Sequence, residues 1–300
     1  MDQAEQLRML VKQQERKMPT ARVITVTSGK GGVGKTSIAV NLAIQIQRMG
    51  KRVIVLDADF GLANIEVMLG IRPQYNLADL MFRGKSLSEI ITKGPEDIGF
   101  ISGGSGIQEL ARMTKEQVMY LTQKLVELDS MADVIIVDTG AGIADNVLEF
   151  VTASSEVLLV ATPEPTSITD AYALLKALNK RAGFKRENTS IKMISNRVNS
   201  EAEGRNLYEK MSIVVDKFLN IQPEFLGMIP QDDLISKAVM IQKPITVAYP
   251  NSAAAKALMA IAAKLYDGTE QDVKKGITGL FSDMIRTKFR KARNKKEGER

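Results

Sequence analysis

The sequence contains no cysteine and no histidine among its 300 residues. Without cysteine, the chain has no disulfide, no thiolate nucleophile and no cysteine-ligated metal or iron–sulfur site, which suits a reducing compartment. Without histidine, no imidazole can act as general base, metal ligand or pH switch. Any hydrolytic chemistry must therefore depend on carboxylates, lysines, backbone amides and a metal ion.

Long hydrophobic runs are also missing. Residues 1–19 are charged and contain no apolar core segment, so no signal peptide is expected, and no apolar stretch is long enough to span a bilayer. We therefore expect a cytoplasmic protein. With 44% hydrophobic residues, a chain of this length can bury one large α/β core with short appendages.

A glycine-rich run after the first apolar segment is the most informative motif. Residues 23–27 lead into the pattern G-x-x-x-x-G-K-[ST], which begins at Gly29. Between a strand and a helix, such a loop points backbone N–H groups at phosphates, while its lysine reaches the β- and γ-phosphates and its Thr hydroxyl ligates Mg²⁺. The predicted nucleotide-binding residues are Gly29, Gly31, Gly32, Val33, Gly34, Lys35, Thr36 and Ser37.

A second lysine, Lys30, directly follows the first glycine of this loop. A phosphate-binding loop gains little from two cations on one protomer, and the arrangement resembles the deviant Walker A loop of the MinD/ParA family. In that family the matching lysine reaches across a dimer to the partner's nucleotide. The resemblance implies that Lys30 and Lys35 both act in catalysis and that ATP holds two copies of the chain together.

Strand-like and helix-like segments alternate along the chain. Continuous apolar runs predict strands buried on both faces at 23–27, 53–56, 98–102, 134–137, 157–161, 191–195 and 225–228. Helical periodicity occurs at 36–49, 115–128, 167–181, 202–218 and 253–266. The alternation predicts an α/β fold with a mostly parallel, twisted sheet covered by helices on both faces. The expected organisation is a short N-terminal segment (1–20), one domain (21–266), and a linker with a C-terminal amphipathic helix (267–300).

Two acidic motifs come at the ends of predicted strands, where a parallel sheet places its ligands. Asp57 and Asp59 follow the second strand two residues apart, so both can face the phosphates; we expect Asp57 to hold the Mg²⁺ shell and Asp59 to position the attacking water. Asp138 ends another apolar strand and can hold Mg²⁺ through water, with the glycine-rich turn after it as a switch. The metal is thus expected at Thr36, Asp57 and Asp138.

These motifs together resemble the MinD/ParA family of dimerising ATPases over residues 22–266. The resemblance implies a P-loop NTPase fold with ATP sandwiched between two protomers, and a catalytic role for Asp59 in activating water. Residues 60–64 are similar to the MinD branch in particular, whereas Thr139 and Gly140 replace its usual Ser-Pro. The expected switch residues are Asp59, Asn64, Gly140 and Gly142.

The base is expected to be adenine. No [NT]-K-x-D tetrad typical of guanine sites follows a strand, whereas Asn196 closes one, and its amide can both donate to and accept from the adenine edge. Similarity to the family implies that Asn196, Arg197 and Pro230 flank the base; the alternative is that Asn196 only forms a turn. The expected cofactors are ATP or ADP with Mg²⁺.

Positive charge is concentrated in the tail. The last thirty residues carry ten basic and four acidic side chains, which accounts for the whole net charge of +6, so the rest is neutral. Seven apolar tail residues recur at spacings that place them on one side of a helix. This pattern predicts binding to an anionic membrane, with docking on the sheet or nucleic-acid contact as alternatives. The expected membrane residues are Val273, Ile277, Leu280, Phe281, Met284, Ile285 and Phe289, with the basic Lys288 and Arg290.

Residues 2–11 precede the first strand and belong to neither loop nor sheet. They look like the D-Q-A-x-x-L-R segment of the FlhG (FleN, YlxH) family of flagellar number regulators, which docks on the GTPase FlhF and stimulates its GTP hydrolysis. The alternative is a frayed terminal helix. The resemblance implies partner contacts by Asp2, Gln3, Ala4, Leu7 and Arg8, with Gln3 at the composite active site.

The sequence thus predicts a slow, Mg²⁺-dependent regulatory ATPase that cycles between a cytosolic monomer and an ATP-bound, membrane-attached homodimer. Its expected role is to set flagellar number and placement by stimulating an FlhF-type GTPase and delivering basal-body components. Two alternatives stay open. A MinD-type regulator of the cell-division site would not need the N-terminal segment, and a DNA-partitioning ATPase of the ParA type is disfavoured by the neutral body.

Overall fold

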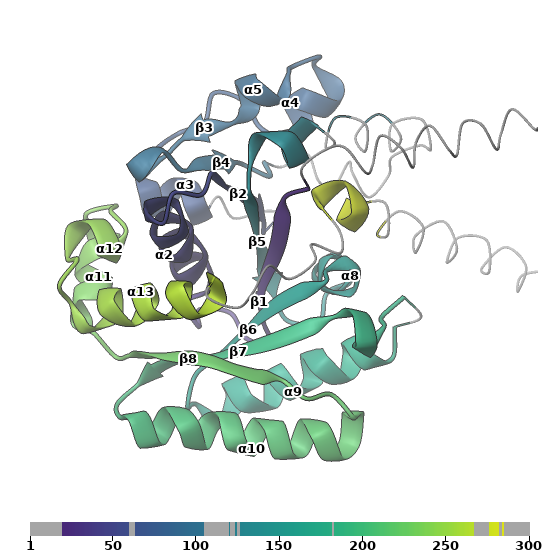
Figure 1. Ribbon diagram of the computed structural model, residues 1–300, viewed down its shortest axis with the longest axis vertical. Helices are drawn as coiled ribbons and strands as arrows, with labels where there is room; N and C mark the ends of the chain where they lie inside the picture. Colours follow the sequence, from purple (N-terminus) through teal and green to yellow (C-terminus); the bar gives the residue numbers. More distant parts are fainter. Residues whose placement is uncertain are drawn as a thin grey trace, which may run out of the picture.

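The computed structural model describes residues 20–59, 64–104, 120, 124, 127–181, 183–266, 276–281 and 284. Within these ranges the centre of the molecule is an eight-stranded sheet in the order β3-β4-β2-β5-β1-β6-β7-β8 (Figure 1). Every neighbouring pair is parallel except β3 and β4. The predicted α/β fold with a mostly parallel sheet is confirmed.

The sheet and its helices alternate as the apolar runs predict. The strands are β1 (Arg22–Ser28), β2 (Val53–Ala58), β3 (Thr92–Lys93), β4 (Gly99–Ile101), β5 (Val134–Ala141), β6 (Glu156–Ala161), β7 (Ser190–Val198) and β8 (Glu224–Pro230). The helices are α2 (Lys35–Arg48), α3 (Asn64–Leu69), α4 (Leu77–Phe82), α5 (Leu87–Ile90), α8 (Asp145–Ala153), α9 (Pro165–Asn179), α10 (Glu201–Leu219), α11 (Asp233–Met240), α12 (Ile245–Ala248) and α13 (Ala253–Tyr266). Two short 3-10 turns, Pro95–Asp97 and Arg186–Asn188, complete the described elements.

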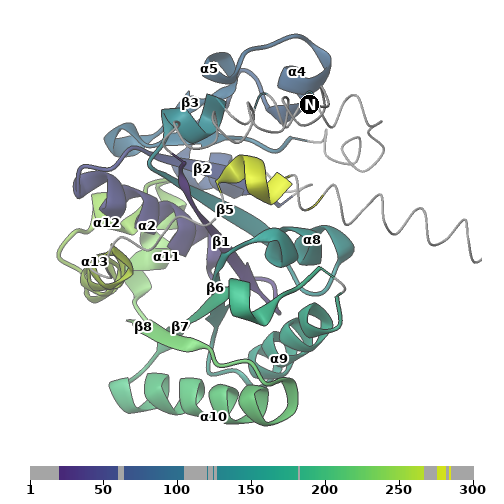
Figure 2. The ribbon, with the colours of Figure 1, turned by 45° about the vertical axis from the view of Figure 1, so that its right-hand side comes forward.

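Helices cover both faces of the sheet, which Figures 1 and 2 show from two directions. Alternate residues of β1 mark the two faces: Ile24 and Val26 lie in one apolar cluster with α2 and α13, and Val23 lies in another with α4, α5 and part of α8. A third cluster joins α9 and α10 to β6 and β7. Both faces of the sheet are buried from solvent, which is why the strands are continuously apolar and do not alternate between apolar and polar residues.

Strands β2 and β5 extend further than predicted. We expected Asp57 and Asp138 just beyond their strands, but both lie inside them, directly opposite each other in the parallel ladder. The reason is that β5 has neighbours on both sides, β1 and β2, and the ladder continues through Thr139 and Ala141. The predicted helix at 115–128 falls mostly outside the described residues, and its described end is helical at 127–131.

Three charged side chains form a buried cluster where β1, β6 and β7 begin. Arg22 donates two 2.8 Å hydrogen bonds to the two carboxylate oxygens of Glu156, and the Lys192 ammonium donates a third at 2.9 Å. Burial alone would raise the pKa of Glu156, but Arg22 and Lys192 outweigh it and lower that pKa below its usual value. The carboxylate therefore holds two cations that would otherwise be desolvated without a partner.

Replacing Glu156 by alanine should lower the free energy of unfolding by about 3–5 kcal/mol, because the change leaves buried cations unpaired. Urea denaturation measures this. The matched control is Glu201→Ala, which breaks an exposed pair with Arg205 and should cost under about 1 kcal/mol. The pKa of Glu156 is lower in the folded chain than in the unfolded chain. Its contribution to the free energy of unfolding is therefore present above the unfolded pKa of about 4.3 and is lost as pH falls through the folded pKa. Equal losses in the two variants would contradict a buried ionic role.

Candidate functional site

The loop between β1 and α2 has the backbone shape that its sequence motif predicts. Gly32 and Gly34 have positive φ angles of 74° and 97°, a region that favours glycine. Gly34 is also the N-cap of α2, and its carbonyl accepts the first helical hydrogen bond from Ile38. The fourteen-residue helix that starts here directs unpaired N–H groups and partial positive charge toward the loop. Such a site favours phosphate.

Two glycines of this loop are required by close packing. A Cβ on Gly29 would overlap the backbone of Asp170 and Ala171 in α9, and a Cβ on Gly34 would lie 2.6 Å from the Asn196 amide nitrogen. Gly31 and Gly32, by contrast, have open space where a Cβ would lie. The loop is therefore held between α9 and the end of β7, while its middle stays accessible to a ligand.

Lys35 lies at the start of α2 and is buried, with 7% of its surface exposed. Burial lowers the pKa of its ammonium, and the carboxylates of Asp138 and Asp59 partly offset this. Thr36 and Ser37, the next two residues, are only partly buried. The predicted phosphate-binding lysine thus lies near Asp59, which is predicted to be catalytic, and near Asp138, which is predicted to hold Mg²⁺.

Asp57 and Asp138 form the acidic floor of the site. Burial, followed by the charge of Asp138, raises the pKa of Asp57 to about 8. Burial also raises the pKa of Asp138 to about 7, against the smaller opposing effects of Thr36 and Lys35. Neither Asp138 oxygen has a hydrogen-bond partner of good geometry among the described residues. Such a carboxylate is costly to bury unless a cation neutralises it.

These residues fit a magnesium ion held mainly by phosphate and water. In the described part of the chain, no group of three acidic side chains converges closely enough to hold a metal ion alone. Mg²⁺ in nucleotide sites is normally bound through one or two carboxylates together with substrate phosphates. Thr36, Asp57 and Asp138 supply that kind of incomplete, oxygen-only shell.

Three of the predicted switch residues meet around one carboxylate. Asp59 accepts a 2.9 Å hydrogen bond from the Asn64 amide, and its backbone N–H donates to Asp57. Its other oxygen lies against Gly140, where a Cβ would come within 3.0 Å. The fourth switch residue, Gly142, has a φ of 86° and donates to the Ser28 carbonyl at the start of the phosphate loop. The two switch segments therefore contact each other and the loop.

Lys30 is paired within its own chain. Its ammonium donates to Glu164 at 2.6 Å and to the Thr166 hydroxyl at 2.8 Å, and the hydrogen bond from Lys30 lowers the pKa of Glu164. In this single chain, then, the lysine expected to reach a partner protomer lies on its own body. Sequence reasoning missed Glu164 and Thr166, although they flank Pro165 at a helix start beyond a strand, a typical ligand position.

The predicted base-binding residues lie together at the ends of β7 and β8, and Asn196 also contacts the phosphate loop. Its amide nitrogen donates to the Val33 carbonyl at 2.7 Å with one of its two N–H groups, and its buried oxygen has no hydrogen-bond partner among the described residues. Arg197 is exposed with a positive φ of 57°, a strained conformation often found at functional sites. Pro230 ends β8 beside Val198. One N–H of the Asn196 amide therefore supports the phosphate loop, and its contact with adenine stays a prediction.

Several predicted site residues lie outside the described residues. These are Asp2, Gln3, Ala4, Leu7, Arg8, the stretch 60–63, Val273, Ile285, Lys288, Phe289 and Arg290. The described part of the tail lies on the body in this single chain, and its membrane role stays a prediction. Ile277, Leu280 and Phe281, expected at a membrane, are almost completely buried against the body, and Met284 is partly buried there. In the single chain, this apolar cluster shields the three side chains from water.

Comparison with known proteins agrees with this geometry. A family profile described as ParA, NUBPL iron-transfer P-loop NTPase, matches residues 20–266. The absence of cysteine excludes a cysteine-held iron–sulfur cluster in this member. The antiactivator FleN of Pseudomonas aeruginosa is 43% identical over 248 residues, which cover 83% of this chain and 87% of FleN.

Two further similarities extend this result. The flagellum site-determining protein YlxH of Helicobacter pylori is 32% identical and covers 88% of this chain and 90% of YlxH. Among solved structures, the septum site-determining protein MinD of Pyrococcus horikoshii, complexed with Mg-ADP, aligns with a TM-score of 0.65 and 25% identity over 84% of this chain and 99% of that one. The chain therefore belongs to the ParA/MinD family of P-loop NTPases and resembles its flagellar members FleN and YlxH.

Proposed function

We propose that this protein is a slow, Mg²⁺-dependent ATPase whose nucleotide state controls dimerisation and membrane attachment, and that it regulates flagellar number and placement. The observation that carries the proposal is the meeting of Lys35, Asp59 and Asp138 at one phosphate loop, in a chain 43% identical to FleN. ATP is the expected substrate because the chain belongs to a P-loop NTPase family and resembles MinD of Pyrococcus horikoshii, which was solved with Mg-ADP.

Each residue of the site has a chemical task in this reaction. The backbone of the loop and Lys35 bind the phosphates, and Asp59, held by Asn64, orients the attacking water. Thr36, Asp57 and Asp138 would hold Mg²⁺, which neutralises charge on the β- and γ-phosphates when bound. With no histidine in the chain, catalysis depends on positioning and electrostatics, which fits slow turnover.

Dimerisation follows from the second lysine. In the single chain, Lys30 binds Glu164 and Thr166. A partner's triphosphate carries more negative charge than one partly exposed carboxylate and would bind the Lys30 ammonium more strongly. We assign Lys30 to that contact in the dimer. The homodimer then carries two tails, and two weak membrane anchors on one particle hold far longer than one.

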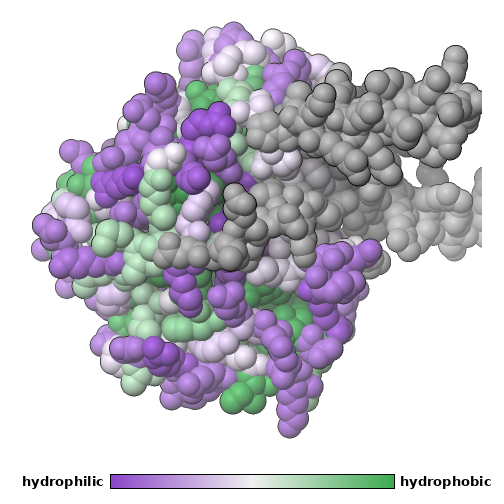
Figure 3. Space-filling view, in the orientation of Figure 1, coloured by the Kyte–Doolittle hydropathy of each residue, from purple (hydrophilic) through white to green (hydrophobic). Residues whose placement is uncertain are grey.

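The protein body does not itself look like a membrane surface. Within the described ranges no helix has the length and apolarity needed to cross a bilayer. Hydrophilic residues cover most of the rim of the face in Figure 3, with hydrophobic residues mainly in its middle and at its lower edge. We therefore propose peripheral attachment of a cytoplasmic protein to anionic lipid through residues 272–300. The segment 2–11 would stimulate an FlhF-type GTPase, and basal-body components would be the cargo.

Vesicle sedimentation tests the coupling between nucleotide and membrane. With vesicles of phosphatidylcholine and phosphatidylglycerol, the intact chain should pellet with ATP and much less with ADP or no nucleotide. A variant that lacks residues 272–300 should stay in the supernatant in all three conditions, because the anchor is gone. Equal pelleting of the intact chain in all three conditions would contradict the proposed coupling.

A further inference from the structure

The first described part of the tail, residues 276–281, is docked as a helix on the body. Ile277, Leu280 and Phe281 are 0%, 1% and 4% exposed and belong to the apolar cluster that contains Val137 of β5. The Phe281 ring packs edge-on against Phe150 of α8, with centroids 5.8 Å apart and planes at 88°. These are the same side chains that an amphipathic anchor would insert into lipid, so docking and insertion exclude each other.

A carboxylate from a distant part of the chain caps this helix. Asp129 accepts hydrogen bonds from the backbone N–H of Ile277 at 2.8 Å and of Thr278 at 3.3 Å, and from the Thr278 hydroxyl at 2.7 Å. These N–H groups are among those that a helix start leaves unpaired, and a negative charge there is favourable. Asp129 is 7% exposed, and no ion pair involves it within the part of the chain that the structure describes. The tail is therefore its main polar partner.

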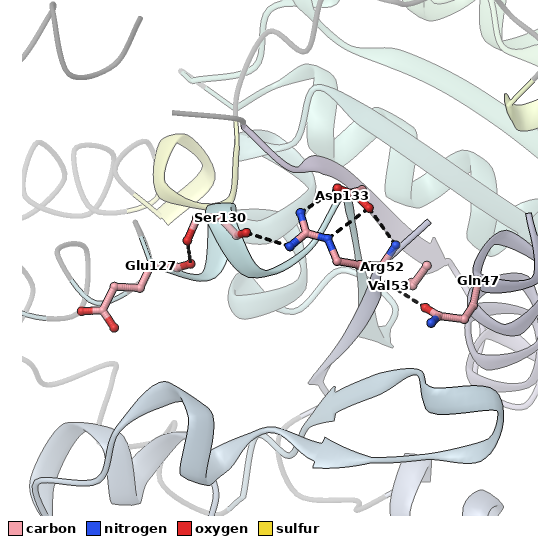
Figure 4. Close-up of polar contacts among 6 residues, drawn as sticks. All are labelled: Gln47, Arg52, Val53, Glu127, Ser130 and Asp133. Carbon is pink, nitrogen blue, oxygen red and sulfur yellow. Dashed lines mark hydrogen bonds and ion pairs between the residues drawn. The ribbon is translucent and has the colours of Figure 1, made fainter. Parts of the chain in front are cut away.

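The segment that carries Asp129 is itself fixed to the sheet. Figure 4 shows Arg52 donating to the Ser130 carbonyl and to both carboxylate oxygens of Asp133, with the yellow tail helix beside Ser130. The Arg52 backbone N–H also donates to Asp133. Residues 127–133 are thus tied to the start of β2 by bonds that do not involve the tail, and these bonds hold the segment that carries Asp129.

Gly276 completes the contact. A Cβ at this position would collide with the Asp129 carboxylate and with the Thr20 side chain. Its carbonyl accepts the first helical hydrogen bond, from Leu280, so it stands at the N-terminus of the docked helix. The close approach of the backbone to Asp129 is possible only because the residue has no side chain.

We infer that Asp129 is a positioning residue that latches residues 276–281 to the body and so sets the threshold at which the tail enters a membrane. The inference rests on the proposed function, since it takes the lipid surface as the competing site. Its new content is the latch: a capped helix must give up three hydrogen bonds and the Phe150 contact before its apolar face is free. Lipid binding by a single chain is thereby suppressed.

Hydrogen–deuterium exchange on the full, nucleotide-free chain without lipid tests the latch directly. In Asp129→Ala, tail amides in 277–281 should exchange roughly fivefold faster, the effect of losing a helix cap. Asp129→Asn keeps an oxygen acceptor and should retain most of the protection. Gly276→Ala should resemble Asp129→Ala because its Cβ collides with the cap. The control Glu209→Ala removes an exposed acid from α10 and should exchange like the unmodified chain.

The same variants are then sedimented with the phosphatidylcholine–phosphatidylglycerol vesicles in the absence of nucleotide. Asp129→Ala should pellet severalfold more than the unmodified chain and Glu209→Ala. Unchanged tail exchange in Asp129→Ala would overturn the latch. Faster exchange without extra pelleting, in a chain that does pellet with ATP, would overturn its role as a membrane threshold. If no variant pellets under any condition while exchange is faster, the latch stands and the proposed membrane function falls.

Discussion

Replacing Asp59 by alanine is expected to reduce ATP turnover by about 10²–10³-fold, the usual contribution of a positioned base, while ATP binding and ATP-induced dimerisation persist. The chain has no histidine that could take over. Asp59 is held by a hydrogen bond from Asn64 and lies beside Gly140 of the other switch segment. Phosphate release under single-turnover conditions measures the effect, with nucleotide affinity measured separately.

Two companion variants make this result specific. Asn64→Ala should give an intermediate loss, because Asp59 stays but is no longer held in position. Asp216→Ala removes an exposed aspartate from α10 and should leave turnover unchanged. Retention of more than a tenth of the activity in Asp59→Ala would show that another group positions the water, and would remove Asp59 from the mechanism.

The second large effect is expected at Lys30. Lys30→Ala should weaken ATP-dependent dimerisation at least ~30-fold, the loss typical of removing one partner from a desolvated charge contact across an interface. Light scattering during gel filtration, with a non-hydrolysable ATP analogue and Mg²⁺, measures the mass directly. The variant should elute as a monomer at concentrations where the unmodified chain is a dimer.

Glu164→Ala is the informative counterpart, because it removes the acid that binds Lys30 within one chain and leaves the lysine bonded to the neutral Thr166 hydroxyl. This variant should dimerise at least as well as the unmodified chain. Lys85→Ala, which breaks an exposed pair with Glu89, should have no effect. A stable dimer of Lys30→Ala would mean that the second lysine serves only its own protomer.

Long, continuous patterns in the sequence were sufficient to predict most strands of the sheet and the longer helices. The apolar runs of β1, β2, β5, β6, β7 and β8 and the periodic pattern of α13 correspond to elements in the structure. The short helices α3, α4, α5, α11 and α12 were not predicted, because four to eight residues are too few to establish a helical period. Capping boxes mark two of them: Asn76 and Asp79 bond reciprocally at the start of α4, and Ser86 and Glu89 do so at the start of α5.

The site was predictable in its residue types but not in its pairings. A loop motif specifies which side chains bind phosphate, and the glycines, Lys35 and Asp138 meet as expected. The contacts of Lys30 with Glu164, of Asn196 with Val33 and of Asp129 with the tail join residues more than 130 positions apart. No local pattern encodes such contacts, because they arise only when the sheet brings its strands together.

The junction at Thr20 and Gly276 has a consequence for genetics. The chain enters the described domain at Thr20, and the docked helix starts at Gly276 in contact with it. A substitution at either position therefore alters the contact at which the N-terminal and C-terminal segments both join the body. Mutant screens that aim to assign separate phenotypes to the two ends must use residues further along each one, because alleles at this junction will always score for both.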